Sequence, residues 1–250
     1  MTPGDRQLDE THEDLDRRSI LAGMARLAVG GLAVGGGLLG CASSVRQVAR
    51  PMPDLPESAP LRTPSRTVVT ARPDAKTLPG VLARRTWTTA QPTTRSMRRT
   101  PGRLTDITIH HDGLGTPLAT SSERASKARL DLIRRAHVGK GWSDIGYHFA
   151  IDRGGRVWQC RPLEWEGAHV RSHNPGNIGI LVMGNFEIER PTRQQLDALN
   201  SFVNMSRRTY GISVARVRTH REWQGAATSC PGKYLQPQVL AMRSRSFRVA

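Results

Sequence analysis

Two histidines and a cysteine stand where they could share a metal ion. His110 lies in the alternating, β-branched run 107–111, which predicts a short strand that leads into a polar loop. Cys230 lies ten positions after His220, across a stretch that contains Gly225 and ends in Pro-Gly. Because such a stretch cannot continue as a helix, it must turn back, which can bring both residues to one ion. Spacing alone also allows ordinary loop histidines and a buried cysteine.

These residue types suit one metal in particular. Imidazole nitrogens and thiolate sulfur are preferred ligands of zinc, and a zinc hydrolase uses three protein ligands and leaves a fourth position for water. The sequence contains no short helical ligand motif such as H-E-x-x-H that would identify a known zinc site by spacing. A metal hydrolase is therefore a hypothesis that needs support from other segments.

Three segments supply that support: ITIHH (107–111), GKGWSDIGYHF (139–149) and HREWQGAATSCPG (220–232). Together they resemble the zinc-dependent N-acetylmuramoyl-L-alanine amidases of the amidase_2 family, which share a fold with peptidoglycan recognition proteins. The resemblance covers roughly residues 83–242. It implies a Zn²⁺ cofactor, and the family's metal ligands match His110, His220 and Cys230.

The resemblance also assigns residues around the metal. The tyrosine that polarises the substrate carbonyl matches Tyr147, and the residue two positions before the last ligand matches Thr228. His169 and Asn174 match groove residues that touch the muramyl peptide. Other members carry Lys where this chain has Thr228, and threonine is a poor general base because its pKa is far from 7. The base stays open, with Tyr147 or a zinc-held hydroxide as candidates.

The activity implied by the resemblance is hydrolysis of the amide that joins the lactyl group of N-acetylmuramic acid to L-alanine of the stem peptide. Zinc lowers the pKa of water from ~15.7 toward ~7 and polarises a carbonyl, while the Tyr147 hydroxyl would stabilise the oxyanion. A second hypothesis is a non-catalytic protein of the envelope that binds muramyl peptides, as recognition proteins do when the cysteine is lost. The presence of Cys230 favours catalysis.

The N-terminal residues indicate export. Arg17 and Arg18 precede a weakly hydrophobic, glycine-rich stretch (20–39), a pattern typical of twin-arginine signals. The segment LLGC, which ends at Cys41, resembles a lipobox. We predict a signal peptide over residues 1–40, lipidation of Cys41, and a lipoprotein anchored to a membrane in the periplasm or on the outer surface. An ordinary cleaved signal or an uncleaved anchor would also place the protein outside the cytoplasm.

Composition divides the rest of the chain. Residues 41–81 are rich in Pro, Ser, Thr and Arg with no sustained apolar period, which predicts a disordered linker. The formal net charge of +16 suits anionic polymers and acidic lipids. A third hypothesis is thus an envelope protein that holds acidic polymers through this basic linker. No nucleic-acid recognition motif appears, so we expect no nucleic acid partner. We expect the amidase domain over residues 82–250, as a monomer.

Periodicity within residues 82–250 predicts an α/β fold, in which helices flank a mixed central sheet and the zinc site lies at one edge of the sheet. One helix is expected from a capping box of Thr120 and Glu123 to about His137. A second is expected from a cap of Thr192 and Gln195 to a stop at Gly211. His137 would lie on the helix face that packs near the sheet and would not bind the metal. Strands are expected at 107–111, 146–152, 157–161, 178–183 and 214–219.

Two further expectations concern the site. The strand predicted at 146–152 sends Tyr147 and Phe149 to one side and His148 to the other, because strand side chains alternate. Three cysteines are too few for a disulfide framework. A disulfide between Cys160 and Cys230 would nevertheless abolish the metal site, so it is the direct rival of the zinc hypothesis.

Overall fold

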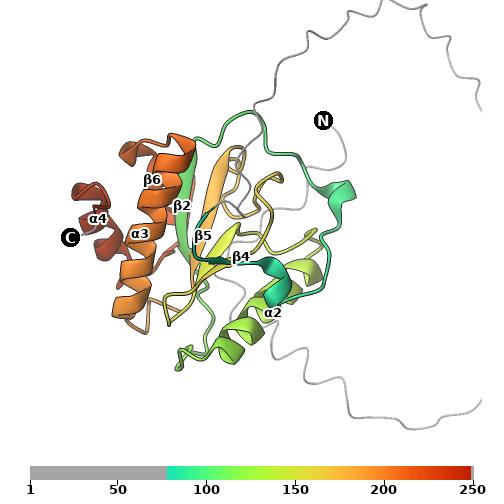
Figure 1. Ribbon diagram of the computed structural model, residues 1–250, viewed down its shortest axis with the longest axis horizontal. Helices are drawn as coiled ribbons and strands as arrows, with labels where there is room; N and C mark the ends of the chain where they lie inside the picture. Colours follow the sequence, from blue (N-terminus) through green and yellow to red (C-terminus); the bar gives the residue numbers. More distant parts are fainter. Residues whose placement is uncertain (1–77, 249–250) are drawn as a thin grey trace, which may run out of the picture.

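The computed structural model describes residues 78–248. The predicted signal peptide, the lipidation site at Cys41 and most of the linker lie outside the described residues. Within residues 78–248, no helix combines the length and the hydrophobicity needed to cross a bilayer. Figure 1 shows a central sheet with helices packed on both of its faces.

The sheet has six strands in the order β1-β4-β3-β5-β2-β6. All neighbouring pairs are parallel except the antiparallel hairpin of β3 and β4, so the predicted mixed sheet is confirmed. The strands are β1 (Val81–Leu82), β2 (Asp106–His111), β3 (Phe149–Ile151), β4 (Val157–Gln159), β5 (Asn177–Val182) and β6 (Val217–Thr219).

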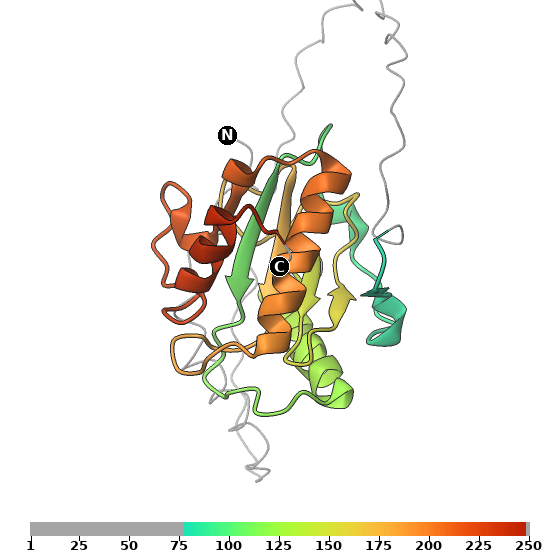
Figure 2. The same ribbon diagram turned by 60° about the vertical axis from the view of Figure 1, so that its left-hand side comes forward.

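Within residues 78–248, three α-helices cover the sheet. α2 lies on one face, and α3 and α4 lie on the other (Figures 1 and 2). Short 3-10 turns occupy 84–86, 94–96, 214–216 and 220–222. The helices are α2 (Glu123–Gly139), α3 (Arg193–Tyr210) and α4 (Gln236–Ser244).

The two long helices begin in different ways. α3 has the predicted capping box of Thr192 and Gln195 and ends at Gly211, whose φ of 68° suits glycine. The capping box predicted for Thr120 and Glu123 is wrong. Ser122 is the N-cap of α2, and its side chain accepts a hydrogen bond from the backbone N–H of Ala125. Ser122 takes this place because it directly precedes the helix, where its hydroxyl reaches the third helical N–H.

The two faces of the sheet differ in chemistry. In β2, Ile107 and Ile109 point into a core formed with Leu199, Phe202 and Val203 of α3. The alternate residues, Thr108 and His110, are equally buried but point to the face that carries α2. On that face a second cluster contains Leu130 and Ile133 of α2, together with Ile145, Tyr147, Trp158 and Leu181.

The hairpin is shorter than predicted. β3 begins at Phe149, so residues 146–148 precede the strand. Of the two glycines in the turn, only Gly155 has a positive φ, 80°. Asp152 closes the turn by accepting hydrogen bonds at Oδ1 from the N–H groups of Gly154 and Arg156. At the other end of the chain, Val214–Arg216 forms a 3-10 turn, so the predicted strand starts only at Val217.

Candidate metal centre

The ends of two adjacent strands bring the two histidines together. β2 and β6 are parallel and pair Ile109 with Thr219. His110, the next-to-last residue of β2, and His220, which directly follows β6, therefore lie at the same end of the two strands. Their ring centroids lie 4.7 Å apart. His220 begins a 3-10 turn that Glu222 closes by accepting the N–H of Thr219 at 2.7 Å.

The loop after that turn folds back, as predicted, and delivers Cys230. The backbone N–H of Arg221 donates to the carbonyl of Cys230 over 3.1 Å, and Thr228 Oγ1 accepts the N–H of Cys230 at 3.1 Å. The N–H of His111 lies 3.4 Å from Cys230 Sγ. These contacts fix both the backbone and the sulfur of the cysteine next to β2.

The three residues form a group that could hold a metal. One potential ligand atom from each of His110, His220 and Cys230 lies within 4.8 Å of the other two. His110 Nδ1 lies 3.7 Å from Cys230 Sγ. Tetrahedral zinc, with Zn–N of about 2.0–2.1 Å and Zn–S of about 2.3 Å, separates such atoms by roughly 3.6 Å. The residues therefore fit zinc in both donor type and spacing.

Burial sets the protonation of the sulfur. Cys230 is 5% exposed, and burial raises the pKa of its thiol to about 12. A thiolate would be costly at this position without a cation, because charge is poorly solvated there. A bound metal supplies that cation and deprotonates the thiol. This is the arrangement expected of a ligand and not of a free nucleophile.

Tyr147 lies beside the group, with its ring centroid 5.1 Å from that of His110. It is 1% exposed, and burial, with Cys230 and Asp112 nearby, raises the pKa of its hydroxyl well above the usual value. The hydroxyl therefore keeps its proton at neutral pH and can donate a hydrogen bond.

The predicted alternation around Tyr147 is wrong. Tyr147 packs in the cluster under α2, whereas Phe149 packs in the opposite core. The reason is that Tyr147 lies before β3, where the backbone does not follow strand alternation. His148 lies outside the metal group. Its Nδ1 accepts the N–H of Gly179, its Nε2 lies 3.0 Å from the carbonyl of Trp165, and burial lowers its pKa to about 4.

Aromatic rings continue from the metal group toward the surface. The His137 ring lies 5.7 Å from that of Tyr147 and 4.5 Å from that of Trp142. As predicted, His137 is satisfied on the inner face of α2, where its Nδ1 accepts the N–H of Gly146 at 3.0 Å, and it does not join the metal group.

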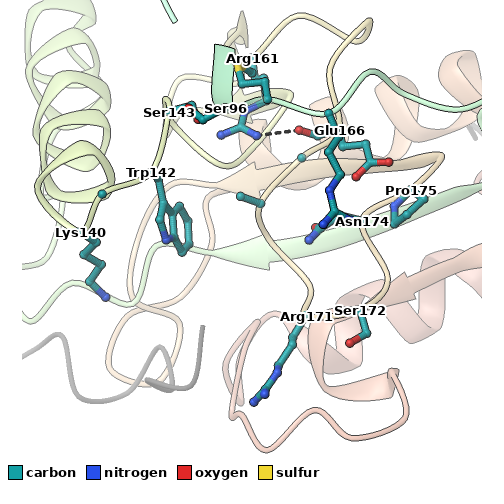
Figure 3. A pocket seen from close by; sticks show the side chains of 15 residues that line it. Ser96, Lys140, Trp142, Ser143, Arg161, Glu166, Arg171, Ser172, Asn174 and Pro175 are labelled. Atoms are coloured by element: carbon teal, nitrogen blue, oxygen red, sulfur yellow. Dashed lines mark hydrogen bonds between the residues drawn. The ribbon is translucent and has the colours of Figure 1, made fainter. Parts of the chain in front are cut away.

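Trp142 borders a surface pocket of about 690 Å³ (Figure 3). The pocket lies between the segment that follows α2 and the loop before β5. Four of its lining side chains are basic and one is acidic, so the pocket favours anionic groups. These charged residues are Arg98, Lys140, Arg161, Arg171 and Glu166.

Comparison with known proteins decides the family. The profile of Amidase_2, described as N-acetylmuramoyl-L-alanine amidase, matches residues 100–233, which include the metal group and Tyr147. The chain belongs to the Amidase_2 family. The endolysin of Enterobacteria phage K11 is 35% identical over 124 residues, which are 46% of this chain and 80% of the endolysin.

Solved structures show the same fold. Wild-type Drosophila PGRP-LB has a TM-score of 0.56 and 28% identity, over 64% of this chain and 91% of that protein. A mutant of Drosophila PGRP-LB in complex with tracheal cytotoxin has a TM-score of 0.56 and 27% identity, over 64% and 92% of the two chains. The predicted fold, with the metal group at one edge of the sheet, is confirmed.

Two residues expected in the Amidase_2 groove have different surroundings. Asn174 lines the pocket, and its Oδ1 accepts the N–H groups of His169 and Val170, so it also holds its own loop. His169 is 4% exposed and lies against His110, with Nδ1 of His169 3.1 Å from Nε2 of His110. Burial and the nearby His148 lower the pKa of His169 well below the usual value. Their contact with substrate stays a prediction.

The rival disulfide is absent. Cys160 and Cys230 are both free and buried. Cys160 directly follows β4 and packs in the cluster under α2, where burial raises the pKa of its thiol far above the usual range. It is an inert core residue and leaves Cys230 available to a metal.

The sequence did not predict the contacts that hold residues 144–147, the segment that contains Tyr147. The Arg161 guanidinium donates to the carbonyls of Ile145 at 2.8 Å, Glu166 at 2.6 Å and Asp144 at 3.1 Å. Arg84 pairs with the Asp144 carboxylate at 2.9 Å. Arg84 and Asp144 are 60 positions apart, so no local pattern in the sequence shows that they meet.

Proposed function

We propose that this chain is a zinc-dependent hydrolase that cleaves the amide between the lactyl group of N-acetylmuramic acid and L-alanine in peptidoglycan. The observation that carries the proposal is the convergence of His110, His220 and Cys230 at one edge of the sheet, beside a buried, protonated tyrosine. The ligand set fits zinc, and the chain is an Amidase_2 member.

Each side chain around the metal group would have a separate role. His110, His220 and Cys230 would hold zinc, which when bound supplies an activated water and polarises a carbonyl. The Tyr147 hydroxyl would donate a hydrogen bond to the oxygen that gains negative charge, and the closeness of its ring to that of His110 supports this role. Because its pKa is raised, Tyr147 is unsuited to act as the base at neutral pH. Thr228 accepts the Cys230 N–H, so it supports the ligand loop.

The substrate would lie along the path from the metal group to the basic pocket. Trp142 borders the pocket, and an aromatic ring of this kind can pack against a sugar or a peptide backbone. The basic lining of the pocket suits the carboxylates of a stem peptide. Relatives of the same fold bind tracheal cytotoxin, described as monomeric diaminopimelic acid-type peptidoglycan, which supports a muramyl peptide as ligand.

A second function is binding of muramyl peptides without cleavage. Several relatives are named peptidoglycan-recognition proteins, so the fold alone does not distinguish the two functions. The intact His-His-Cys group favours hydrolysis, because a protein that only binds peptidoglycan has no need of a buried thiolate ligand.

Product analysis separates the two functions. The full chain, loaded with zinc, is incubated with purified sacculi, and the soluble products are examined by mass spectrometry. Hydrolysis predicts free stem peptides that begin with L-alanine, together with glycan that carries the lactyl carboxylate, and both should disappear after chelation of the metal. Retention of the protein on sacculi without such products would support the binding function instead.

We also propose export by the twin-arginine route and attachment to a membrane through a lipid on Cys41. The support is the Arg17-Arg18 pair and the LLGC segment. Changing both arginines to lysine should stop export, because lysine lacks the planar guanidinium. Fractionation of cells that express either form checks this, and normal export of the Lys-Lys form would point to the general secretory route.

A further inference from the structure

His169 is held in a tightly built position behind the metal group. Its ring lies between His110, 3.1 Å away, and the carbonyl of Asn177, 3.2 Å from Nε2. Gly167 and Gly179 pack against the ring so closely that a Cβ on either would lie 2.3 Å and 2.5 Å, respectively, from His169 Cδ2. The ring therefore has one orientation, and larger residues at these glycine positions would displace it.

The hydrogen bonds around His169 determine which nitrogen carries its proton. The carbonyl oxygen of Asn177 can only accept, so Nε2 of His169 must donate. In an imidazole with its hydrogen on Nε2, the other nitrogen, Nδ1, presents a lone pair. That lone pair must accept a hydrogen from Nε2 of His110, because the two nitrogens lie 3.1 Å apart.

The tautomer of His169 thus determines the tautomer of His110, which belongs to the metal group. If Nε2 of a neutral His110 carries the proton, its Nδ1 presents a lone pair, and this is the atom that lies 3.7 Å from Cys230 Sγ. A metal can bind only the unprotonated nitrogen. The partner on the far nitrogen of a ligand histidine sets its tautomer and its orientation, and loss of that partner typically weakens metal binding about 10–100-fold.

We propose that His169 is a positioning residue, which sets the tautomer and ring orientation of His110 for metal binding through a relay that begins at the Asn177 carbonyl. This assignment rests on the proposed zinc site, but the tautomer it requires belongs to the metal-free protein. His169 acts through His110, so its main effect is on metal affinity.

Zinc affinity of the full chain, measured by competition with a chromophoric chelator, tests the relay. His169→Leu, which removes the acceptor, should weaken binding about 10–100-fold. His169→Asn places an amide oxygen near the position of Nδ1 and should recover part of that loss. His173→Leu removes a histidine from the same loop, one that lies beside Trp223 and not beside His110, and should bind zinc like the wild type. Thermal unfolding of the metal-free variants reports their folding.

A second measurement does not depend on zinc. In ¹⁵N-histidine spectra of the metal-free wild type, His110 should show a protonated, exchange-protected Nε2 and an unprotonated Nδ1, and His169→Leu should lose that protection. A wild-type His110 protonated at Nδ1 would overturn the relay, and so would a folded His169→Leu variant with unchanged zinc affinity. If the wild type binds no zinc but shows the expected tautomer, the relay stands and the zinc function fails.

Discussion

The two faces of the central sheet contain the same strands but different chemistry. The face under α3 and α4 buries Ile107 and Ile109 of β2 among aliphatic and aromatic neighbours. The polar His111 lies at the end of the strand, stacked on Phe186, whose N–H donates to its Nδ1. The face under α2 buries Thr108 and His110 of the same strand, with Tyr147 and His169 around them. One face thus mainly stabilises the fold. On the other, each buried polar atom needs a partner, and those partners build the metal centre.

The largest expected effect is on the polar face. Cys230→Ser should lose zinc and almost all hydrolysis while the metal-free protein keeps its fold, because a neutral hydroxyl is a far poorer zinc ligand than a thiolate. Metal analysis and sacculus digestion check this. Cys160→Ser is the matched control, since Cys160 is also buried under α2 but lies outside the metal group. Undiminished hydrolysis by Cys230→Ser would remove the cysteine from the ligand set.

The apolar face should respond in the opposite way. Phe202 is 2% exposed and packs edge-to-face on Phe149 with ring centroids 4.8 Å apart. Phe202→Ala should lower the free energy of unfolding by about 3–5 kcal/mol because it leaves a cavity. Chemical denaturation measures the loss. Zinc content and kcat of the molecules that remain folded should be unchanged, and a large fall in either would show that the two faces are not separable.

Tyr147 tests the polar face without removing a ligand. Tyr147→Phe keeps the ring but removes the donor, so kcat should fall roughly 10²–10³-fold, as for loss of an oxyanion donor, with zinc content unchanged. Steady-state kinetics on a muramyl peptide, with metal analysis of the same sample, provides the measurement. Full activity, or a loss explained by lost zinc, would exclude this role.

The smallest effect is expected at Thr228. Its hydroxyl accepts the Cys230 N–H, so Thr228→Ala should cost less activity than Tyr147→Phe. Thr228→Lys introduces the residue that the family resemblance implies for other members and should retain activity, with a shifted pH profile because lysine can titrate. Profiles of kcat against pH for both variants check this. A loss in Thr228→Ala as large as that in Tyr147→Phe would give Thr228 a direct part in the reaction.

Features that depend on residues within a single helix or strand could be predicted from the sequence. Alternation along β2 predicted the strand and the exit of His110 from its end, because one strand and its register decide both. The capping box of α3 was predictable for the same reason, since its two residues are three positions apart. The wrong cap of α2 and the wrong side for Tyr147 both came from extending a local pattern past the end of its element.

Contacts between distant segments were beyond local patterns. His169 and His110 are 59 positions apart, and the glycines that fit the His169 ring look like ordinary loop and strand residues in the sequence. The family resemblance predicts substrate contact for His169, and the structure shows that it is also buried against His110. Helix α4 and strand β1 were not predicted, because their nine and two residues carry little periodic signal.

The most direct measurement is X-ray absorption at the zinc edge on the purified, zinc-loaded chain. The metal group predicts one sulfur at about 2.3 Å and two imidazole nitrogens at about 2.0–2.1 Å, with a fourth, light ligand from water. Any zinc that Cys230→Ser retains at high metal concentration should show no sulfur ligand, whereas the sulfur signal should persist in Cys160→Ser. Zinc bound without sulfur, or a sulfur signal lost only in the Cys160 variant, would contradict the assignment of His110, His220 and Cys230 as the metal ligands.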